Sequence, residues 1–266
     1  MAMPLESFSV ETDDGATLAG VRRDGEGTPL VLIHGFGASH RDWQGLIEDL
    51  PSKLALIAYD QRGFGESSAP AGRTYSHGHD LLALLDALGL AQVDLCGMSL
   101  GGATALNFAL DHPNRVRRLI LVSPLMVGWS WSEDWIERWK QIGRAARSGD
   151  IASARELWWQ HPLFESTRKG AAASALKASI AAFHGHQWIE DNQHQALPDL
   201  DRLGLLAVPT LLLTGALDTE DFRLIGDAIS ALGPQVTRID HADAGHMLNF
   251  EIPGRIARDI VDFLSD

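Results

Sequence analysis

Cysteine is nearly missing from this chain of 266 residues: Cys96 stands alone, which excludes an internal disulfide. Cys96 lies in an apolar run, so we expect a buried side chain and not a reactive thiol. Apolar runs long enough to cross a membrane are missing as well. The first residues lack the basic and apolar regions of a signal peptide. These features predict a cytoplasmic protein without a membrane segment.

Positive charge is also scarce, because 22 Lys and Arg face 35 Asp and Glu, a formal net charge of −13. An acidic chain without a basic run is repelled by nucleic acids and anionic membrane surfaces, so we expect neither as a partner. Hydrophobic residues make up 45% of the chain, which is enough for a sizeable core in one large or two small domains. The sequence is compatible with a homo-oligomer.

Apolar strand patterns alternate with helical patterns over most of the chain. The strands are expected at residues 30–33, 54–59, 93–98, 116–122, 210–213 and 236–239, after a hairpin formed by 8–12 and 17–21. The helices are expected at 41–50, 80–88, 99–110, 219–232 and 253–264. This alternation predicts an α/β fold with a doubly wound, mostly parallel sheet.

Residues 127–203 break this pattern, because they contain no convincing strand. Helices are expected there at 133–147, 151–159 and 169–183, together with seven of the eight tryptophans. We expect a core domain formed by 1–126 and 204–266, with 127–203 inserted as a helical cap. Such an insertion would overhang the ligand crevice of an open α/β sheet, so some tryptophans would line a pocket. The alternative is a plain helical layer with tryptophans in its core.

The sequence Gly97-Met98-Ser99-Leu100-Gly101 lies between a predicted strand and a predicted helix. Glycines on both sides allow a tight turn in which the backbones pass closely. This G-x-S-x-G pattern predicts a nucleophile elbow that holds the Ser99 hydroxyl at the end of the sheet. The alternative is a glycine-rich turn whose serine caps the helix. The N–H of Leu100 and that of Phe36, after the 30–33 strand, are the expected donors of an oxyanion hole.

A serine nucleophile needs a base, and the loop between the last strand and the last helix offers His246 and His241. We favour His246 because Gly245 frees the loop to bring the ring toward Ser99. His34 follows a strand too, but we expect it to hydrogen-bond the loop that it opens.

The acid that orients the base should also follow a strand. Asp218 comes after the 210–213 strand and gives the chain order Ser, Asp, His. Glu220 and Asp221 are rivals a few residues later. Asp218 could equally cap the following helix, and the two duties are compatible.

Five motifs in this order resemble those of capped, single-domain α/β-hydrolases. They are His34-Gly35-Phe36-Gly37, residues 60–67 (DQRGFGES), Gly97-Met98-Ser99-Leu100-Gly101-Gly102, Gly215-Ala216-Leu217-Asp218 and Gly245-His246. The resemblance covers nearly the whole chain. It implies the α/β-hydrolase fold, Ser99 as nucleophile, His246 as base, Asp218 as orienting acid and no cofactor.

The resemblance also narrows the chemistry. Relatives that open epoxides or remove halogen carry an aspartate nucleophile, whereas this elbow holds Ser99. Carbon–carbon hydrolases of ring-cleavage products often have Asn before the serine and Trp after the histidine, where this chain has Met98 and Met247. Residues 245–253 look closer to esterases, enol-lactonases and cofactor-free haloperoxidase-like esterases. The expected substrate is a small hydrophobic or aromatic ester or lactone. The alternatives are carbon–carbon hydrolysis and slow-turnover ligand reception.

Two groups of histidines have spacings that suggest a metal. They are His184, His186 and His194, and the pair His77 and His79. No cysteine accompanies them, and both segments read as polar surface. We therefore expect no metal site. Residues 60–67 lack the Gly-Lys-Ser/Thr of a phosphate-binding loop. The resemblance implies a structural role for them beside the site.

Overall fold

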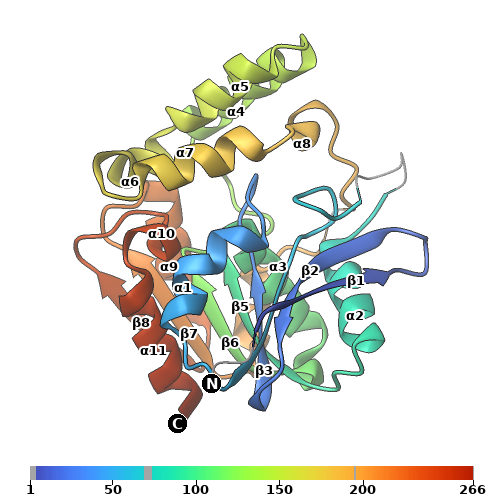
Figure 1. The fold of residues 1–266 in the computed structure, drawn as a ribbon. Coiled ribbons are helices and arrows are strands. Elements are labelled where there is room, and N and C mark those ends of the chain that lie inside the picture. Colours follow the sequence, from blue (N-terminus) through green and yellow to red (C-terminus); the bar gives the residue numbers. More distant parts are fainter. Residues whose placement is uncertain (1–3, 69–73, 195, 266) are drawn as a thin grey trace.

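One eight-stranded sheet runs through the structure, a computed structural model that describes residues 4–68, 74–194 and 196–265 (Figure 1). The strand order is β1-β2-β4-β3-β5-β6-β7-β8. The strands are β1 (Glu6–Glu11), β2 (Thr17–Arg23), β3 (Glu26–Ile33), β4 (Leu54–Tyr59), β5 (Val93–Met98), β6 (Val116–Val122), β7 (Thr210–Gly215) and β8 (Val236–His241).

The β1–β2 hairpin and the β2–β4 pair are antiparallel, and every later pair is parallel. The hairpin turns at Gly15, whose φ of 82° suits glycine. β4, β5 and β7 are buried along almost their whole length because both faces of a parallel sheet are covered. The predicted fold class is confirmed.

Two helical layers cover the sheet. On one face α1 (Gln44–Asp49) and α11 (Pro253–Ser265) bury apolar side chains against Leu32 and Leu56. On the other face lie α2 (His77–Ala87), α3 (Leu100–Asp111) and α9 (Glu220–Leu232), packed against Val31 and Leu95. Cys96 is fully buried in the core, as expected.

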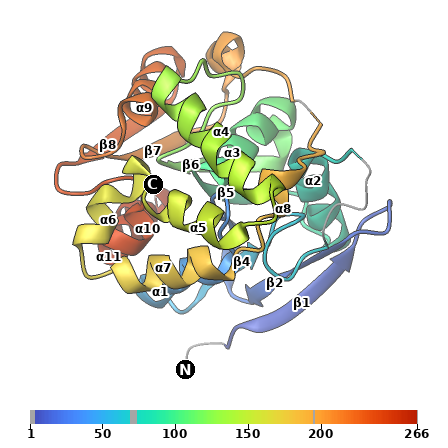
Figure 2. The same ribbon diagram turned by 90° about the horizontal axis from the view of Figure 1, so that it is seen from above.

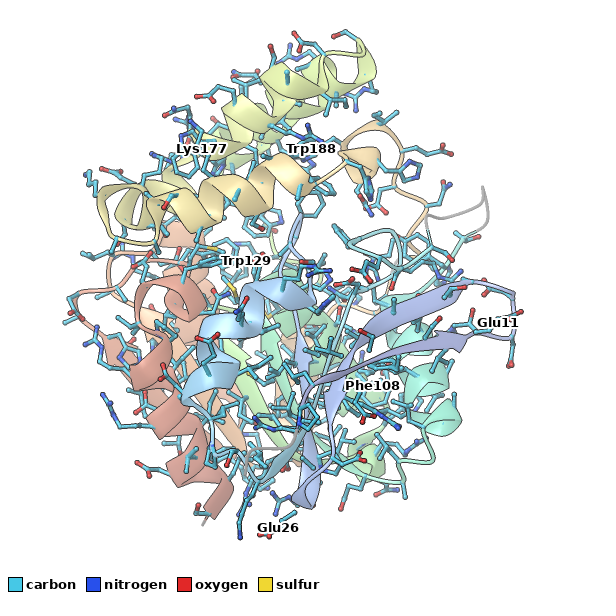
Figure 3. All side chains as sticks on the ribbon, viewed as in Figure 1. Glu11, Glu26, Phe108, Trp129, Lys177 and Trp188 are labelled. Atoms are coloured by element: carbon cyan, nitrogen blue, oxygen red, sulfur yellow. The ribbon has the colours of Figure 1, made fainter. Side chains whose placement is uncertain are left out.

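A third group of helices lies above the carboxyl ends of the parallel strands (Figures 1 and 2). It comprises α4 (Glu133–Arg147), α5 (Ile151–Trp159), α6 (Glu165–Lys169), α7 (Ala173–Ala182) and α8 (His186–Ile189), called here the α4–α8 segment (133–189). In Figure 3, Lys177 and Trp188 lie in this upper layer and Phe108 lies well below it. The segment begins after β6 and ends before β7, so the chain leaves the sheet and returns to the neighbouring strand.

Some element bounds differ from those expected. The helix expected at 41–50 is a 3₁₀ turn, η1 (His40–Trp43), followed by α1. The Asp60 carboxylate accepts hydrogen bonds from the backbone and ring of His40, which holds this first turn toward the sheet. The helix expected at 169–183 is shorter and begins later, as α7 at Ala173, whereas Lys169 ends the separate helix α6. The short helices α8 and α10 (Leu248–Glu251) were not expected.

None of the helices in the described ranges is long and apolar enough to cross a membrane.

Candidate active site

Ser99 occupies the sharp turn between β5 and α3. Its backbone has φ 50° and ψ −115°, outside the regions that side chains ordinarily favour. A Cβ added at Gly97 would overlap the Gly101 carbonyl, and one added at Gly101 would overlap the Ile33 carbonyl. Both glycines are therefore required by close backbone approach, as the sequence pattern predicts. Ser99 has no side-chain bond that caps α3, which does not favour the simple capping alternative.

The loop after β3 lies directly beside Ser99. A Cβ added at Gly35 would lie 3.4 Å from Ser99 Cβ. The neighbouring Phe36 ring packs edge-on against Trp139 and Phe183, with ring centroids 5.0 and 5.3 Å apart. Leu100 is the first residue of α3, where backbone N–H groups lack intrahelical partners. The backbone amides of Phe36 and Leu100 thus belong to two segments that flank the serine.

His34 turns its ring into this loop. Its Nδ1 lies 2.7 Å from the Gly35 carbonyl, and its Nε2 accepts a hydrogen bond from the Gln61 backbone at 3.0 Å. Burial lowers the pKa of His34, so the ring is neutral. The His34 side chain connects the loop after β3 to the loop after β4, which agrees with the structural role expected for this residue. Asp60 holds residues 60–67 in the same way, through bonds to His40 and Glu66.

Asp218 and His246 form a buried pair at the carboxyl ends of β7 and β8. Asp218 Oδ2 lies 2.8 Å from His246 Nδ1. A carboxylate only accepts, so Nδ1 donates and carries a proton, and in the neutral imidazole Nε2 presents a lone pair. Nε2 is buried and has no hydrogen-bond partner among the described residues. The Phe222 ring packs on the imidazole at a centroid distance of 4.2 Å and restricts its orientation.

The rival residues face elsewhere. His241 Nε2 lies 3.1 Å from Asp259 on α11. Glu220 is exposed in the first turn of α9. Asp221 accepts hydrogen bonds from Trp129 Nε1 and Ser132, which connects α9 to the start of α4.

The N-cap of α9 is Thr219, so Asp218 does not cap this helix itself. Asp218 Oδ1 accepts a hydrogen bond from the Thr219 backbone at 2.7 Å. That bond and the bond to His246 use both carboxylate oxygens, which orients the side chain firmly.

Ser99 and His246 open on one cavity of about 680 Å³ beneath the α4–α8 segment. Four tryptophans of the segment 127–203 line it: Trp131, Trp135, Trp139 and Trp158. Trp131 and Trp135 stack at 4.4 Å, and both contact Phe222 beside the histidine. Trp129, Trp159 and Trp188 are not among the lining residues. The cavity is therefore mainly aromatic and aliphatic on the side of α4 and α5.

Helix α6 rests directly on the loop that carries His246. A Cβ added at Gly245 would lie 2.6 Å from Ser166 Cβ, so any larger residue would displace α6. The Glu251 carboxylate accepts hydrogen bonds from Gly245 N at 2.7 Å, Ser166 Oγ at 2.9 Å and Thr167 Oγ1 at 2.5 Å. One acidic side chain thereby connects the histidine loop to the α4–α8 segment.

His77 corrects the expectation that the two histidine segments are polar surface. Its side chain is buried, lines the cavity and packs 5.2 Å from the Tyr75 ring. Burial lowers the pKa of His77 to about 3, so it is neutral. His184 is exposed, as expected, and its ring lies 6.3 Å from that of His186. No group of three or more His, Cys, Asp or Glu suited to a metal occurs within 4–68, 74–194 and 196–265.

The sequence reasoning missed two acidic residues near the site, Asp42 and Glu251. Asp42 lies in η1 and lines the cavity, and its Oδ2 accepts a hydrogen bond from Ser179 on α7. Both depend on where α6 and α7 sit, so sequence spacing carried no signal for either.

A strained serine at a strand-to-helix turn, with a His–Asp pair opening on the same cavity, is typical of hydrolases built on an open α/β sheet. The model of the alpha/beta hydrolase fold family matches residues 28–253, and the chain belongs to this family. The predicted resemblance is confirmed.

Individual relatives include several kinds of hydrolase. The chain is 25% identical over 253 residues to 3-oxoadipate enol-lactonase 1 of Acinetobacter baylyi, which covers 94% of this chain and 93% of that protein. It is 38% identical over 125 residues to a 2-hydroxymuconate semialdehyde hydrolase of Pseudomonas, covering 43% and 44%. The solved structure of a thermophilic esterase from Thermogutta terrifontis is similar with a TM-score of 0.80, 26% identity and 98% coverage of both chains.

Proposed function

We propose that this protein is a serine hydrolase that cleaves a small hydrophobic or aromatic carboxylic ester or lactone through an acyl-enzyme on Ser99. The observation that carries the proposal is the buried Asp218–His246 pair at 2.8 Å, which opens with the strained Ser99 on one aromatic cavity. Similarity to an enol-lactonase and an esterase along almost the full chain supports the same reaction class. No cofactor is required by this chemistry.

In the proposed reaction Ser99 Oγ attacks the substrate carbonyl while His246 Nε2 takes its proton. Asp218 holds the Nδ1–H tautomer and stabilises the imidazolium that forms. The backbone amides of Phe36 and Leu100 donate to the oxyanion, each contributing about 3–4 kcal/mol in comparable sites. The carbon–oxygen bond then breaks and His246 protonates the leaving alcohol. Water repeats the cycle on the acyl-enzyme.

We also propose that residues 127–203 form a cap on a core made of 1–126 and 204–266. The α4–α8 segment lies over the strand ends and supplies most of the aromatic cavity lining, which favours this division. An aromatic cover excludes water and binds apolar substrate groups by burial. The aromatic lining therefore supports small apolar ester or lactone substrates.

The test is a burst assay with 4-nitrophenyl acetate and butyrate on wild type and Ser99→Ala. We expect one nitrophenolate per chain in the burst, followed by steady turnover, and neither in Ser99→Ala, because the acyl-enzyme forms on Ser99. Ser123→Ala is the matched control, since Ser123 is a second buried serine with positive φ, at the end of β6. Its burst should remain.

Other outcomes would redirect the proposal. A burst without subsequent turnover would favour a ligand receptor of the same fold. No reaction in either form would contradict the esterase. Partial similarity to the semialdehyde hydrolase makes a carbon–carbon bond hydrolase the second candidate. Turnover of a vinylogous diketone, with no ester hydrolysis, would establish that candidate instead.

A further inference from the structure

Asp42 is a carboxylate in the substrate cavity that the proposed reaction does not use. It lies in η1, four residues after Ala38 at the end of the loop beside Ser99. Its side chain is half-buried and lines the same cavity as Ser99 and His246. A carboxylate in this position carries a free-energy cost, because an anion in apolar surroundings loses part of its hydration.

The protein gives this carboxylate only neutral hydrogen-bond donors. Ser179 Oγ on α7 donates to Asp42 Oδ2 at 2.7 Å. Asn249 Nδ2 donates to the backbone carbonyl of Asp42 at 2.9 Å, which holds η1 against α10. The Ser39 backbone N–H is a second donor to the carboxylate, and it lowers the pKa of Asp42 by less than burial raises it. Neither donor carries a charge, so the negative charge of the carboxylate is not neutralised by its hydrogen-bond partners.

Burial raises the pKa of Asp42 to about 6, so the side chain is mostly anionic above pH 7. The other charged residues that line the described part of the cavity are Lys140 and Asp191, and both are exposed. Water screens exposed charges more strongly than half-buried ones. His77 adds no cation because burial keeps it neutral. The local field beside η1 is thus negative.

We infer that Asp42 determines the charge preference of the cavity, so that it takes esters with an uncharged, hydroxyl-bearing or cationic group and disfavours esters with a carboxylate. This inference rests on the proposed function, because it names the substrates of that same site. Repulsion between two anions about 6 Å apart at an effective dielectric constant of about 20 corresponds to about 10- to 100-fold in affinity. Lactones formed from dicarboxylic acids, which keep one free carboxylate, fall in the disfavoured class.

Binding to Ser99→Ala protein tests the inference without requiring turnover. Each of two probe pairs compares a charged molecule with a neutral counterpart of similar size. Mono-4-nitrophenyl glutarate replaces the terminal methyl of 4-nitrophenyl valerate by a carboxylate. Butyrylcholine is the cationic counterpart of 3,3-dimethylbutyl butyrate. Dissociation constants are measured by calorimetry at pH 7.5 in Ser99→Ala and in Ser99→Ala with Asp42→Asn.

We expect Asp42→Asn to reduce the preference for valerate over glutarate about 10-fold, and to weaken butyrylcholine relative to its neutral counterpart. An apolar cavity disfavours any carboxylate, even without Asp42. The inference is therefore tested by the change in preference that Asp42→Asn causes, and not by the size of the preference in one protein. Ser179→Ala removes the hydroxyl donor but keeps the charge, so both ratios should remain. Asp49→Asn is the matched control, because Asp49 is exposed on α1 and outside the cavity lining.

Ratios that change less than twofold in Asp42→Asn would overturn the inference. Asp42→Ser repeats the test if the asparagine variant does not fold. Failure to bind any of the four probes would also overturn it. Failure of the proposed function appears separately, as the absence of Ser99-dependent turnover of the neutral esters by the intact protein.

Discussion

At Ser99 the backbone conformation favours glycine, whereas the proposed reaction requires the hydroxyl of a serine. A non-glycine residue held in such a conformation costs about 1–3 kcal/mol. The surrounding close contacts, at Gly97 and Gly101, hold it there nevertheless. Strain of this kind is tolerated where it positions a reacting atom, and the hydroxyl at the end of β5 fits that description.

Ser99→Gly should therefore separate stability from activity. We expect it to raise the free energy of unfolding by about 1 kcal/mol relative to Ser99→Ala, because glycine adopts positive φ without steric cost. Both variants should lack the burst. Urea unfolding of the two proteins measures the difference, and a less stable glycine variant would contradict the strain argument.

Asp42 predicts a pH dependence of stability. Its pKa is raised from 3.8 to about 6 in the folded protein, so folding favours the protonated carboxyl. The resulting stabilisation is present below about pH 4 and is lost as pH rises through 6. Asp42→Asn should therefore raise the free energy of unfolding by about 1–3 kcal/mol at pH 8 and change it little at pH 4. Thermal unfolding at both pH values measures this, with Asp49→Asn expected to show no such difference.

Among the elements, α6 has an unusual position, because it touches the loop of His246 although it belongs to the α4–α8 segment. The connection is made by Glu251, which joins Gly245 to Ser166 and Thr167. Movement of α6 and movement of the histidine are therefore coupled through three hydrogen bonds to one carboxylate. Any opening of the upper layer at this end would disturb the orientation of the imidazole.

Removing the donors on α6 tests this connection. Ser166→Ala with Thr167→Val should lower the free energy of unfolding by about 2–4 kcal/mol, because bonds to a charged acceptor are strong and Thr167 is fully buried. KM for 4-nitrophenyl butyrate should rise. Lys169→Ala on the same helix is the control, since its ion pair with Glu165 is exposed and should contribute below about 1 kcal/mol. Equal effects of the two variants would contradict the coupling.

The elements that sequence reasoning located best are those with the strongest local signal. β4 and β5 were predicted with their observed bounds, because a strand buried on both faces is mostly apolar, and Asp94 is the one charged residue of these two strands. The first half of β3, residues 26–29, was missed because it is polar and ends at a proline. Helices of four or five residues, such as α8 and α10, are too short to show a period.

The candidate site was predictable for a topological reason. The parallel strands have their carboxyl ends at one edge of the sheet, so the residues that follow β5, β7 and β8 lie near one another for many loop conformations. Ser99, Asp218 and His246 are the residues that follow these strands. Asp42 and Glu251 were not predictable, because their partners lie on α6 and α7, whose placement depends on tertiary packing. The catalytic roles stay a prediction until the burst is measured.

The whole molecule carries a formal net charge of −13, which acts on charged substrates before they reach the cavity. Raising sodium chloride from about 20 to about 200 mM should increase kcat/KM for mono-4-nitrophenyl glutarate about two- to threefold, because salt screens the long-range repulsion. The value for 4-nitrophenyl valerate should stay constant. Asp42→Asn should show the same salt effect, since the half-buried carboxylate acts at short range. A salt effect that disappears in Asp42→Asn would show that Asp42, and not the net charge of the molecule, causes the long-range repulsion.

Cys96 has a practical consequence. It is fully buried in the sheet, and burial raises the pKa of its thiol, so it resists maleimide reagents in the folded protein. A cysteine introduced at an exposed position of α5, such as Leu157, would be the only accessible thiol. Fluorescent dyes could then be attached to the upper layer without removing the native cysteine. The wild-type background is in this respect ready for labelling at a single chosen site.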